Sequence, residues 1–227
     1  YLPAALRDEL GIDKLPHHSV EELEERAWER EWLKDFGPMQ FGERLWICPH
    51  GQAVDAADAV VVHLDPGLEC GSGTHPTTAM GLDWLDGIDL VGKTVLDYGC
   101  GSGVLGIAAL KLGAAAATGM DIDPQAVIAS RQNAAENGVN IAVRGSADEI
   151  TGQFDVLVAN ILAGPLVEFA DSITSRLAEG GMLALSGVLC EQAPQVIAAY
   201  DPWIEFDEPV FQELDGQTWS RLTGSRR

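Results

Sequence analysis

Basic residues are scarce in this chain of 227 residues, which has 14 lysines and arginines against 35 aspartates and glutamates and a formal charge of −21 at pH 7. Such a field repels phosphate groups, so we expect no direct binding to nucleic acid, and it attracts a basic partner. Long apolar runs are missing as well. The longest run of small apolar residues, Val104 to Met120, is interrupted by Lys111 and Gly113. We therefore expect no membrane span and no membrane partner.

Cysteine is also rare and widely scattered. None of the four cysteines belongs to a Cys-x-x-Cys pair, and one lies inside a glycine-rich turn, a poor place for a disulfide. Free thiols in a reducing cytoplasm fit this distribution, and we expect no metal site. We expect no signal peptide either, because Arg7, Asp8 and Glu9 interrupt the first apolar residues. The cysteines are Cys48, Cys70, Cys100 and Cys190.

Residues 1–37 differ in composition from the rest of the chain. They are strongly charged, and residues 19–26 begin a helical pattern that Gly37-Pro38 ends. Trp28 and Trp32 lie one turn apart on this helix, so we expect them to dock it on a neighbouring domain. Residues 38–227 hold enough apolar sequence for one full domain.

The order of the expected elements in that domain indicates the α/β class. From Val91 onward short apolar strands alternate with helices, which is typical of a parallel, doubly wound sheet. We expect its strands at 94–98, 116–121, 140–144, 154–159 and 181–186. We expect its helices at 103–112, 124–137, 163–178 and 190–199.

Segments on both sides depart from this alternation. Two strands at 44–48 and 59–64 and a helix at 77–85 are expected before it. After it, residues 210–214 and 217–222 flank Asp215-Gly216, a pair that predicts a hairpin turn. We therefore expect a mostly parallel sheet, Rossmann-like, with a C-terminal antiparallel hairpin.

The most informative stretch is residues 94–103, Thr-Val-Leu-Asp-Tyr-Gly-Cys-Gly-Ser-Gly, which predicts a strand, a glycine turn and the start of a helix. Alternating Gly99, Gly101 and Gly103 would let a nucleotide-like cofactor lie against bare backbone and the positive end of the helix. Two motifs match here. One is the dinucleotide pattern Gly-x-Gly-x-x-Gly, which begins at Gly101 and has Asp121 twenty residues on. The other is Asp-x-Gly-x-Gly-x-Gly, which begins at Asp97.

Charge favours the second motif. Asp97 places a carboxylate in front of the turn, where it would repel a pyrophosphate and attract the ammonium group of S-adenosylmethionine, a cofactor without phosphate. No lysine or arginine follows the turn until Lys111. Asp121 does not discriminate, because a carboxylate at this strand end can accept both ribose hydroxyls of either cofactor. We prefer S-adenosylmethionine, and an NAD-dependent oxidoreductase remains the alternative.

Asn160 is the candidate catalytic residue. It follows the strand expected at 154–159, so its amide would lie at the ligand-binding edge of the sheet. It could cap the helix expected from residue 163, or its carbonyl could hold an amine substrate or one end of the cofactor in line. Ile161 and Leu162 cannot stack on a planar acceptor, which favours a flexible alkyl amine over a nucleobase. No convincing general base is evident, and we expect His75 to have a structural role in its loop.

Three longer segments carry a resemblance that covers essentially the whole chain. They are residues 64–68 (Leu-Asp-Pro-Gly-Leu), 73–78 (Gly-Thr-His-Pro-Thr-Thr) and 159–166 (Ala-Asn-Ile-Leu-Ala-Gly-Pro-Leu). They resemble the PrmA family, class I S-adenosylmethionine-dependent methyltransferases of the large-subunit ribosomal protein L-eleven. The resemblance implies a cytoplasmic enzyme that methylates amine nitrogens, on lysine side chains or the N-terminal amine, of a basic ribosomal protein.

The resemblance also implies site residues and domains. Thr78, Gly99, Asp121 and Asn160 fall where the family binds the cofactor, and a loop with Gly73 and Thr74 closes over it; Asp97 and Gly101 of the glycine turn complete the expected set. Residues 1–37 would be the tail of an N-terminal substrate domain with a connecting helix, and 38–227 the methyltransferase domain. A cofactor-binding fragment without turnover remains a further alternative.

Overall fold

A computed structural model describes residues 37–64 and 75–227, and the structural statements below concern these residues. The helix expected from residue 19 and the cofactor-binding positions Gly73 and Thr74 lie outside them. Among the described residues no helix is both long and apolar enough to cross a bilayer.

The main sheet has the order β10-β11-β8-β7-β4-β5-β6, with β9 paired to β11. Strands β6, β5, β4, β7 and β8 run parallel, and the three C-terminal strands are antiparallel to their neighbours. This confirms the expected α/β class, a mostly parallel sheet with a C-terminal antiparallel hairpin. The strands are β4 (Thr94–Tyr98), β5 (Ala116–Met120), β6 (Ile141–Arg144), β7 (Phe154–Asn160), β8 (Leu177–Leu189), β9 (Ile204–Phe206), β10 (Val210–Leu214) and β11 (Gln217–Arg226).

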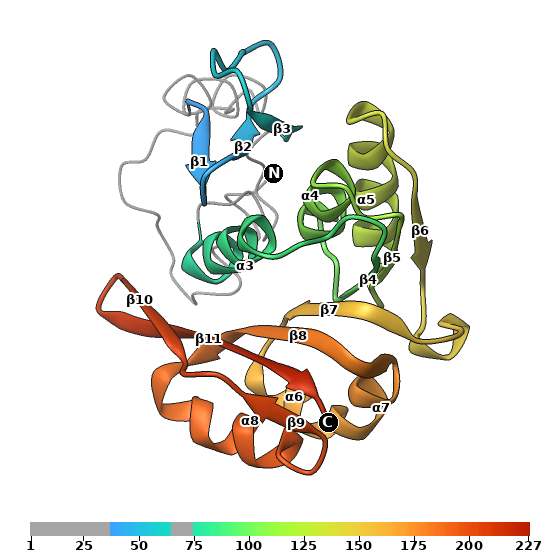
Figure 1. Cartoon of the computed structure of the whole chain (residues 1–227), viewed down its shortest axis with the longest axis vertical. Coiled ribbons are helices and arrows are strands. Elements are labelled where there is room, and N and C mark those ends of the chain that lie inside the picture. The colour runs from blue at the N-terminus through green and yellow to red at the C-terminus, as the bar shows by residue number, and fades with distance from the viewer. Residues whose placement is uncertain (1–36, 65–74) are drawn as a thin grey trace, which may run out of the picture. The chain divides into compact units, whose positions relative to one another are not determined.

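Helices cover both faces of this sheet (Figure 1). Alternate strand residues point to opposite faces, so Val95 and Val156 join one buried cluster while Leu96 and Leu157 join the other. The first cluster packs under α3 (Pro76–Gly87), α4 (Val104–Lys111) and α5 (Pro124–Glu136), and the second under α6 (Ala163–Glu168), α7 (Ala170–Ser175) and α8 (Ala193–Tyr200). Two short 3₁₀ turns, η2 (Ala147–Glu149) and η3 (Cys190–Gln192), also lie in this part of the chain.

A separate small sheet precedes the main one. It contains β1 (Met39–Phe41) and β2 (Leu45–Cys48) as an antiparallel pair, with β3 (Val60–His63) parallel to β2. Helix α3 holds the β1–β2 turn through two carboxylates. Asp86 accepts the backbone N–H of Glu43 at 2.6 Å, and Asp83 accepts that of Gly42 at 2.7 Å. These bonds fix the start of the described chain on the helix that also carries Thr78.

Several boundaries differ from the sequence-based expectation. The single helix expected at 163–178 is wrong: it breaks at Phe169, whose backbone leaves the helical region (φ −101°, ψ 15°), and it ends before β8 begins at Leu177. Apolar residues keep a helical spacing across the break, so the pattern contained no signal for it. Strand β8 is also longer than expected, and β1 and β9, three residues each, were not anticipated.

Candidate cofactor and acceptor site

The glycine turn lies at the carboxyl end of β4, where ligands bind in doubly wound sheets. Gly99, Gly101 and Gly103 all have left-handed backbone, with φ of 76°, 51° and 79°, which glycine adopts without strain. The N–H groups of Gly99 and Cys100 donate to the Met120 carbonyl at 2.7 and 2.9 Å, which ties the turn to the end of β5. Gly103 then caps α4, so the positive end of that helix faces the turn.

Asp97 lies beneath this turn rather than on its surface. Its side chain is buried, with 1% of the residue exposed, and its Oδ2 accepts the N–H of Gly106 in the first turn of α4 at 2.9 Å. Burial raises the pKa of this carboxyl to about 7, the bond from Gly106 opposes the rise, and the nearby charge of Asp121 adds to it. Asp97 therefore holds the helix start in place, and its attraction for a cofactor ammonium group stays a prediction.

Asp121 follows β5 and contacts the same turn. Its Oδ2 accepts the N–H of Gly101 at 2.9 Å and its Oδ1 accepts that of Asp123 at 3.0 Å. A carboxylate offers about four acceptor directions, so each oxygen keeps one for a ligand hydroxyl. The next residue, Ile122, is an apolar side chain with 84% of its surface exposed.

Asn160 and Thr78, both expected at the cofactor site, lie in contact. Asn160 ends β7, and its Nδ2 donates to Oγ1 of Thr78 on α3 at 3.0 Å, across 82 residues of sequence. Thr78 is buried, whereas Asn160 is half-buried. With Nδ2 engaged, the amide oxygen of Asn160 remains the acceptor at this edge of the sheet.

Two glycines accommodate the residue after Asn160. A Cβ on Gly99 would lie 2.2 Å from Cγ2 of Ile161, and a Cβ on Gly187 would lie 2.3 Å from the Ile161 carbonyl oxygen. Gly187 also has a left-handed backbone, with φ of 82°. The close approach brings the glycine turn and the acceptor segment together, so Gly99 supports the site through packing with the chain itself.

His75 caps α3, which confirms that it has a structural role. Its Nδ1 accepts the N–H of Thr77 at 3.3 Å and lies 2.7 Å from the Thr77 hydroxyl. Its ring meets that of Trp219 edge to face, with ring centroids 4.7 Å apart. Burial lowers the pKa of His75 and so favours the neutral ring, the form that can accept the Thr77 N–H. The sequence contained no signal for the contact with Trp219, which joins β11 to the start of α3.

A second contribution that sequence reasoning missed comes from α5. The side-chain amide of Asn133 donates from Nδ2 to the carbonyl oxygen of Ser102 at 2.9 Å, and this bond ties the glycine turn to α5. An asparagine in the middle of a helical pattern gives no indication of this role, because the pairing depends on how α5 packs on the turn.

The described residues fit S-adenosylmethionine. Asp121 offers paired acceptors for two ribose hydroxyls, and exposed Ile122 offers an apolar surface for adenine. Asn160 places an amide at the end of β7, the strand next to β4. The start of α4 at Gly103 faces the same edge of the sheet. These are the groups that a nucleoside cofactor with an amino-acid tail requires.

Comparison with known proteins identifies the family. The family described as ribosomal protein L11 methyltransferase (PrmA) matches residues 3–227. A ribosomal protein L11 methyltransferase of Aeromonas hydrophila is 56% identical over 212 residues, which cover 92% of this chain and 71% of the relative. One from Pseudomonas aeruginosa is 55% identical over 216 residues, covering 94% of this chain and 72% of the relative.

Solved structures agree in fold. A ribosomal protein L11 methylase from Lactobacillus delbrueckii subsp. bulgaricus is similar, with a TM-score of 0.73 and 29% identity. The match covers 85% of this chain and 99% of that one. The N-methyltransferase NodS from Bradyrhizobium japonicum, solved with S-adenosylhomocysteine, shares the fold at a TM-score of 0.56 and 15% identity, covering 67% of this chain and 89% of that one.

These matches reject the oxidoreductase alternative and confirm the expected cofactor, S-adenosylmethionine. The chain belongs to the ribosomal protein L11 methyltransferase (PrmA) family of class I methyltransferases.

Proposed function

We propose that the chain transfers methyl groups from S-adenosylmethionine to amine nitrogens of ribosomal protein L11, on lysine side chains or the N-terminal amine. The observation that carries this proposal is the pairing of Asn160 with Thr78 beside the glycine turn. The names of the relatives supply the substrate protein. A ribosomal protein substrate would place the reaction in the cytoplasm.

Positioning is the main contribution of the protein to this reaction. When bound, S-adenosylmethionine supplies an electrophilic methyl group on a sulfonium. Asn160 then orients the nucleophile: its Nδ2 is held by Thr78, and its Oδ1 accepts an N–H of the incoming amine. Fixing one N–H aims the nitrogen lone pair, which converts an encounter in solution into a reaction between aligned groups.

The amine must lose its proton before it reacts. A lysine with a pKa of about 10.4 is neutral at pH 7 at a cost of about 4.6 kcal/mol, whereas an α-amine costs only about 1 kcal/mol. His75 does not serve as the base in this proposal, since its Nδ1 caps α3. Asn160 is only half-buried, so solvent can take the proton.

Side chains beside Asn160 support an alkyl amine as the acceptor. Leu162, two residues on, exposes 70% of its surface, and Ile161 lies against the glycine turn. Both are aliphatic and can contact the methylene groups of a lysine, but neither offers an aromatic plane for a flat base. The net charge of −21 favours a cationic protein over nucleic acid.

Steady-state kinetics on two variants test this role. Asn160→Ala should lower kcat for methyl transfer to L11 about 100-fold, the order of loss expected when a reacting group is misplaced. Thr78→Val, which removes the hydroxyl that accepts from Asn160, should cost less. Calorimetry with S-adenosylhomocysteine checks that each variant still binds cofactor. Full activity of Asn160→Ala would contradict the assignment.

A further inference from the structure

Within the part of the chain that the structure describes, strand β10 forms an edge of the main sheet, and no other strand pairs with its outer side. Its partner is β11, joined by the turn Asp215-Gly216, where φ of 52° and 76° define a type I′ hairpin. The pair Leu214–Gln217 closes the turn, and bonded pairs alternate along the ladder, so Gln212 pairs inward with Trp219. The N–H and C=O groups of the intervening residues, Phe211 and Glu213, therefore point away from the sheet.

Apolar side chains are exposed along this edge, whose outer side no described strand covers. All five residues of β10 are exposed, and the exposed fractions of Val210, Phe211 and Leu214 are 39%, 47% and 37%. Proteins normally block such edges with proline, lysine or a covering element, because an open edge can pair with another chain. β10 contains no proline and no lysine. A strand of this kind is suited to binding an extended peptide.

The edge lies close to the acceptor site. Trp219, the neighbour of Gln212, packs on His75 at the start of α3. Arg221, the neighbour of Val210, donates its Nη1 to the Met80 carbonyl at 2.7 Å, two residues beyond Thr78. Three strand spacings, about 14 Å in all, separate β7 from β10 across β8 and β11. Figure 1 shows β10 and β11 reaching past α3.

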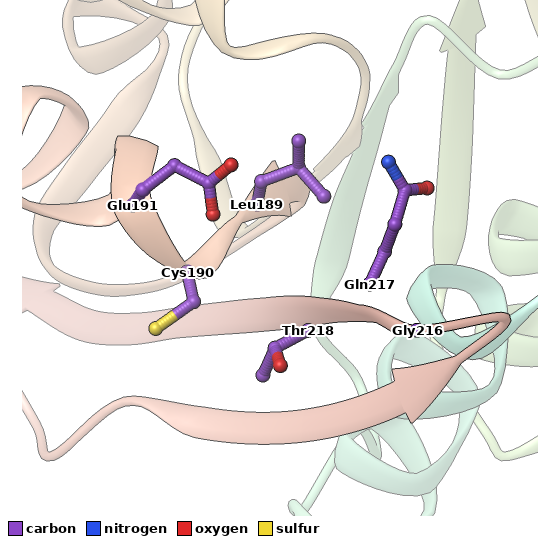
Figure 2. Close-up of a pocket in the computed structure, with 6 residues that line it drawn as sticks. All are labelled: Leu189, Cys190, Glu191, Gly216, Gln217 and Thr218. Carbon is purple, nitrogen blue, oxygen red and sulfur yellow. The ribbon is translucent and has the colours of Figure 1, made fainter.

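Two acidic side chains lie along this edge. Glu213 lies on the strand and Asp215 in its turn, whereas Glu191 follows β8 and lines a pocket on the other side of β11. Figure 2 shows this pocket, with Leu189 between Glu191 and Gln217 in that view. Within 37–64 and 75–227 no basic side chain forms an ion pair with these three acids. The edge therefore offers backbone groups, apolar contacts and acidic side chains together.

We propose that β10 binds an extended, lysine-bearing segment of the ribosomal protein substrate as an added strand, with the acids Glu213 and Asp215 receiving its cations. This inference rests on the proposed function. A strand added outside β10 would lie four strand spacings, about 19 Å, from β7, so a lysine that reaches Asn160 belongs to the part of the segment that leaves the edge and crosses the ends of β11 and β8. The carboxylates disfavour a second copy of this acidic chain on the same edge.

Amide hydrogen exchange tests the added strand directly. With S-adenosylhomocysteine present to prevent turnover, saturating L11 should slow exchange at the outward amides of Phe211 and Glu213 at least about tenfold. The amide of Gln212, already paired with β11, is the internal control. Unchanged exchange at both outward amides would overturn the proposal. Protection of both amides before L11 is added, with a dimer in sedimentation, would overturn it too, because a second copy would then cover the edge.

A proline variant tests the same contact by kinetics. Glu213→Pro removes an outward N–H that β11 does not use, so the hairpin should survive. We expect the KM for L11 to rise about tenfold, the order of effect of losing a binding hydrogen bond and a charge. Glu213→Thr keeps the amide and should raise KM less. Glu168→Thr, which removes an exposed acid at the end of α6, is the matched control and should leave KM unchanged.

The outcomes separate this proposal from the proposed function. Wild-type chain that methylates L11, together with a folded Glu213→Pro variant of unchanged KM, would overturn the role of β10 and leave the function standing. Failure of the wild type to methylate L11 would overturn the function, whereas the exchange experiment would still report whether L11 binds at this edge.

Discussion

Replacing Asp97 with asparagine should make the protein more stable at alkaline pH. Asp97 is buried at 1% exposure, and its Oδ2 bonds to the N–H of Gly106. Asparagine keeps an acceptor for that N–H and carries no charge. Burial raises the pKa of the Asp97 carboxyl from 3.8 to about 7 in the folded protein, which corresponds to about 4 kcal/mol.

The sign of the effect follows from the raised pKa. Between pH 4 and 7 the folded state binds a proton at Asp97 that the unfolded state has lost, so this group makes stability fall as pH rises. The full cost remains above pH 7. Asp97→Asn should therefore exceed wild type in free energy of unfolding by up to about 4 kcal/mol at pH 8, and the gain should shrink toward zero near pH 4.

Urea unfolding of both proteins at about pH 4.5, 6 and 8 measures this difference in the free energy of unfolding. Asp155→Asn is a control of opposite sign, because bonds from the backbone and hydroxyl of Thr94 lower the pKa of Asp155. Asp155 therefore stabilises the fold above its unfolded pKa, and that contribution is lost as pH falls through its folded pKa. A difference between wild type and Asp97→Asn that does not change with pH would refute the reasoning.

The same titration reports on the cofactor. If Asp97 attracts the ammonium group of S-adenosylmethionine, binding lowers the pKa of Asp97 and releases a proton near pH 7. In the wild type, the affinity for the cofactor should then rise between about pH 6 and 8, the interval that contains this pKa. In Asp97→Asn it should stay flat. Equal pH profiles would remove Asp97 from the cofactor site and leave it as a support of α4.

Three other predictions concern the site and its chemistry. Asp121→Asn should weaken S-adenosylmethionine binding about tenfold by calorimetry, because it removes the charge from the proposed ribose acceptor. Gly187→Ala should lower the free energy of unfolding by about 3 kcal/mol, since its Cβ would lie 2.3 Å from the Ile161 carbonyl oxygen. Gly152→Ala, with φ of 80° but open space around it, should cost only about 1 kcal/mol in the same assay. For lysine acceptors, kcat/KM should rise about tenfold per pH unit below pH 10, as the neutral amine becomes more abundant; a flat profile would point to a base within the enzyme.

Local chemistry explains what the sequence could predict. Strand β4 and strand β10 have the expected bounds, because apolar runs end sharply at a glycine turn and at Asp215-Gly216. Asp121 and Asn160 could be located as strand ends, since parallel strands present their carboxyl ends at one edge. The roles inferred from those positions remain predictions for the experiments above.

Contacts between distant segments could not be predicted. Trp219 packs on His75, and Gly187 approaches Ile161, across separations that no local pattern encodes. The burial of Asp97 is a similar case. Its position before the turn suggested a surface carboxylate, and only the packing of α4 on β4 shows that Gly106 takes one of its oxygens.

Mass-spectrometric mapping of L11 after incubation with this chain and S-adenosylmethionine tests the central claim most directly. The account predicts methyl groups on lysine side chains or on the N-terminal amine, present with wild-type chain and strongly reduced with Asn160→Ala. L11 of unchanged mass with the wild type, or methyl groups confined to residues without an amine, would contradict it.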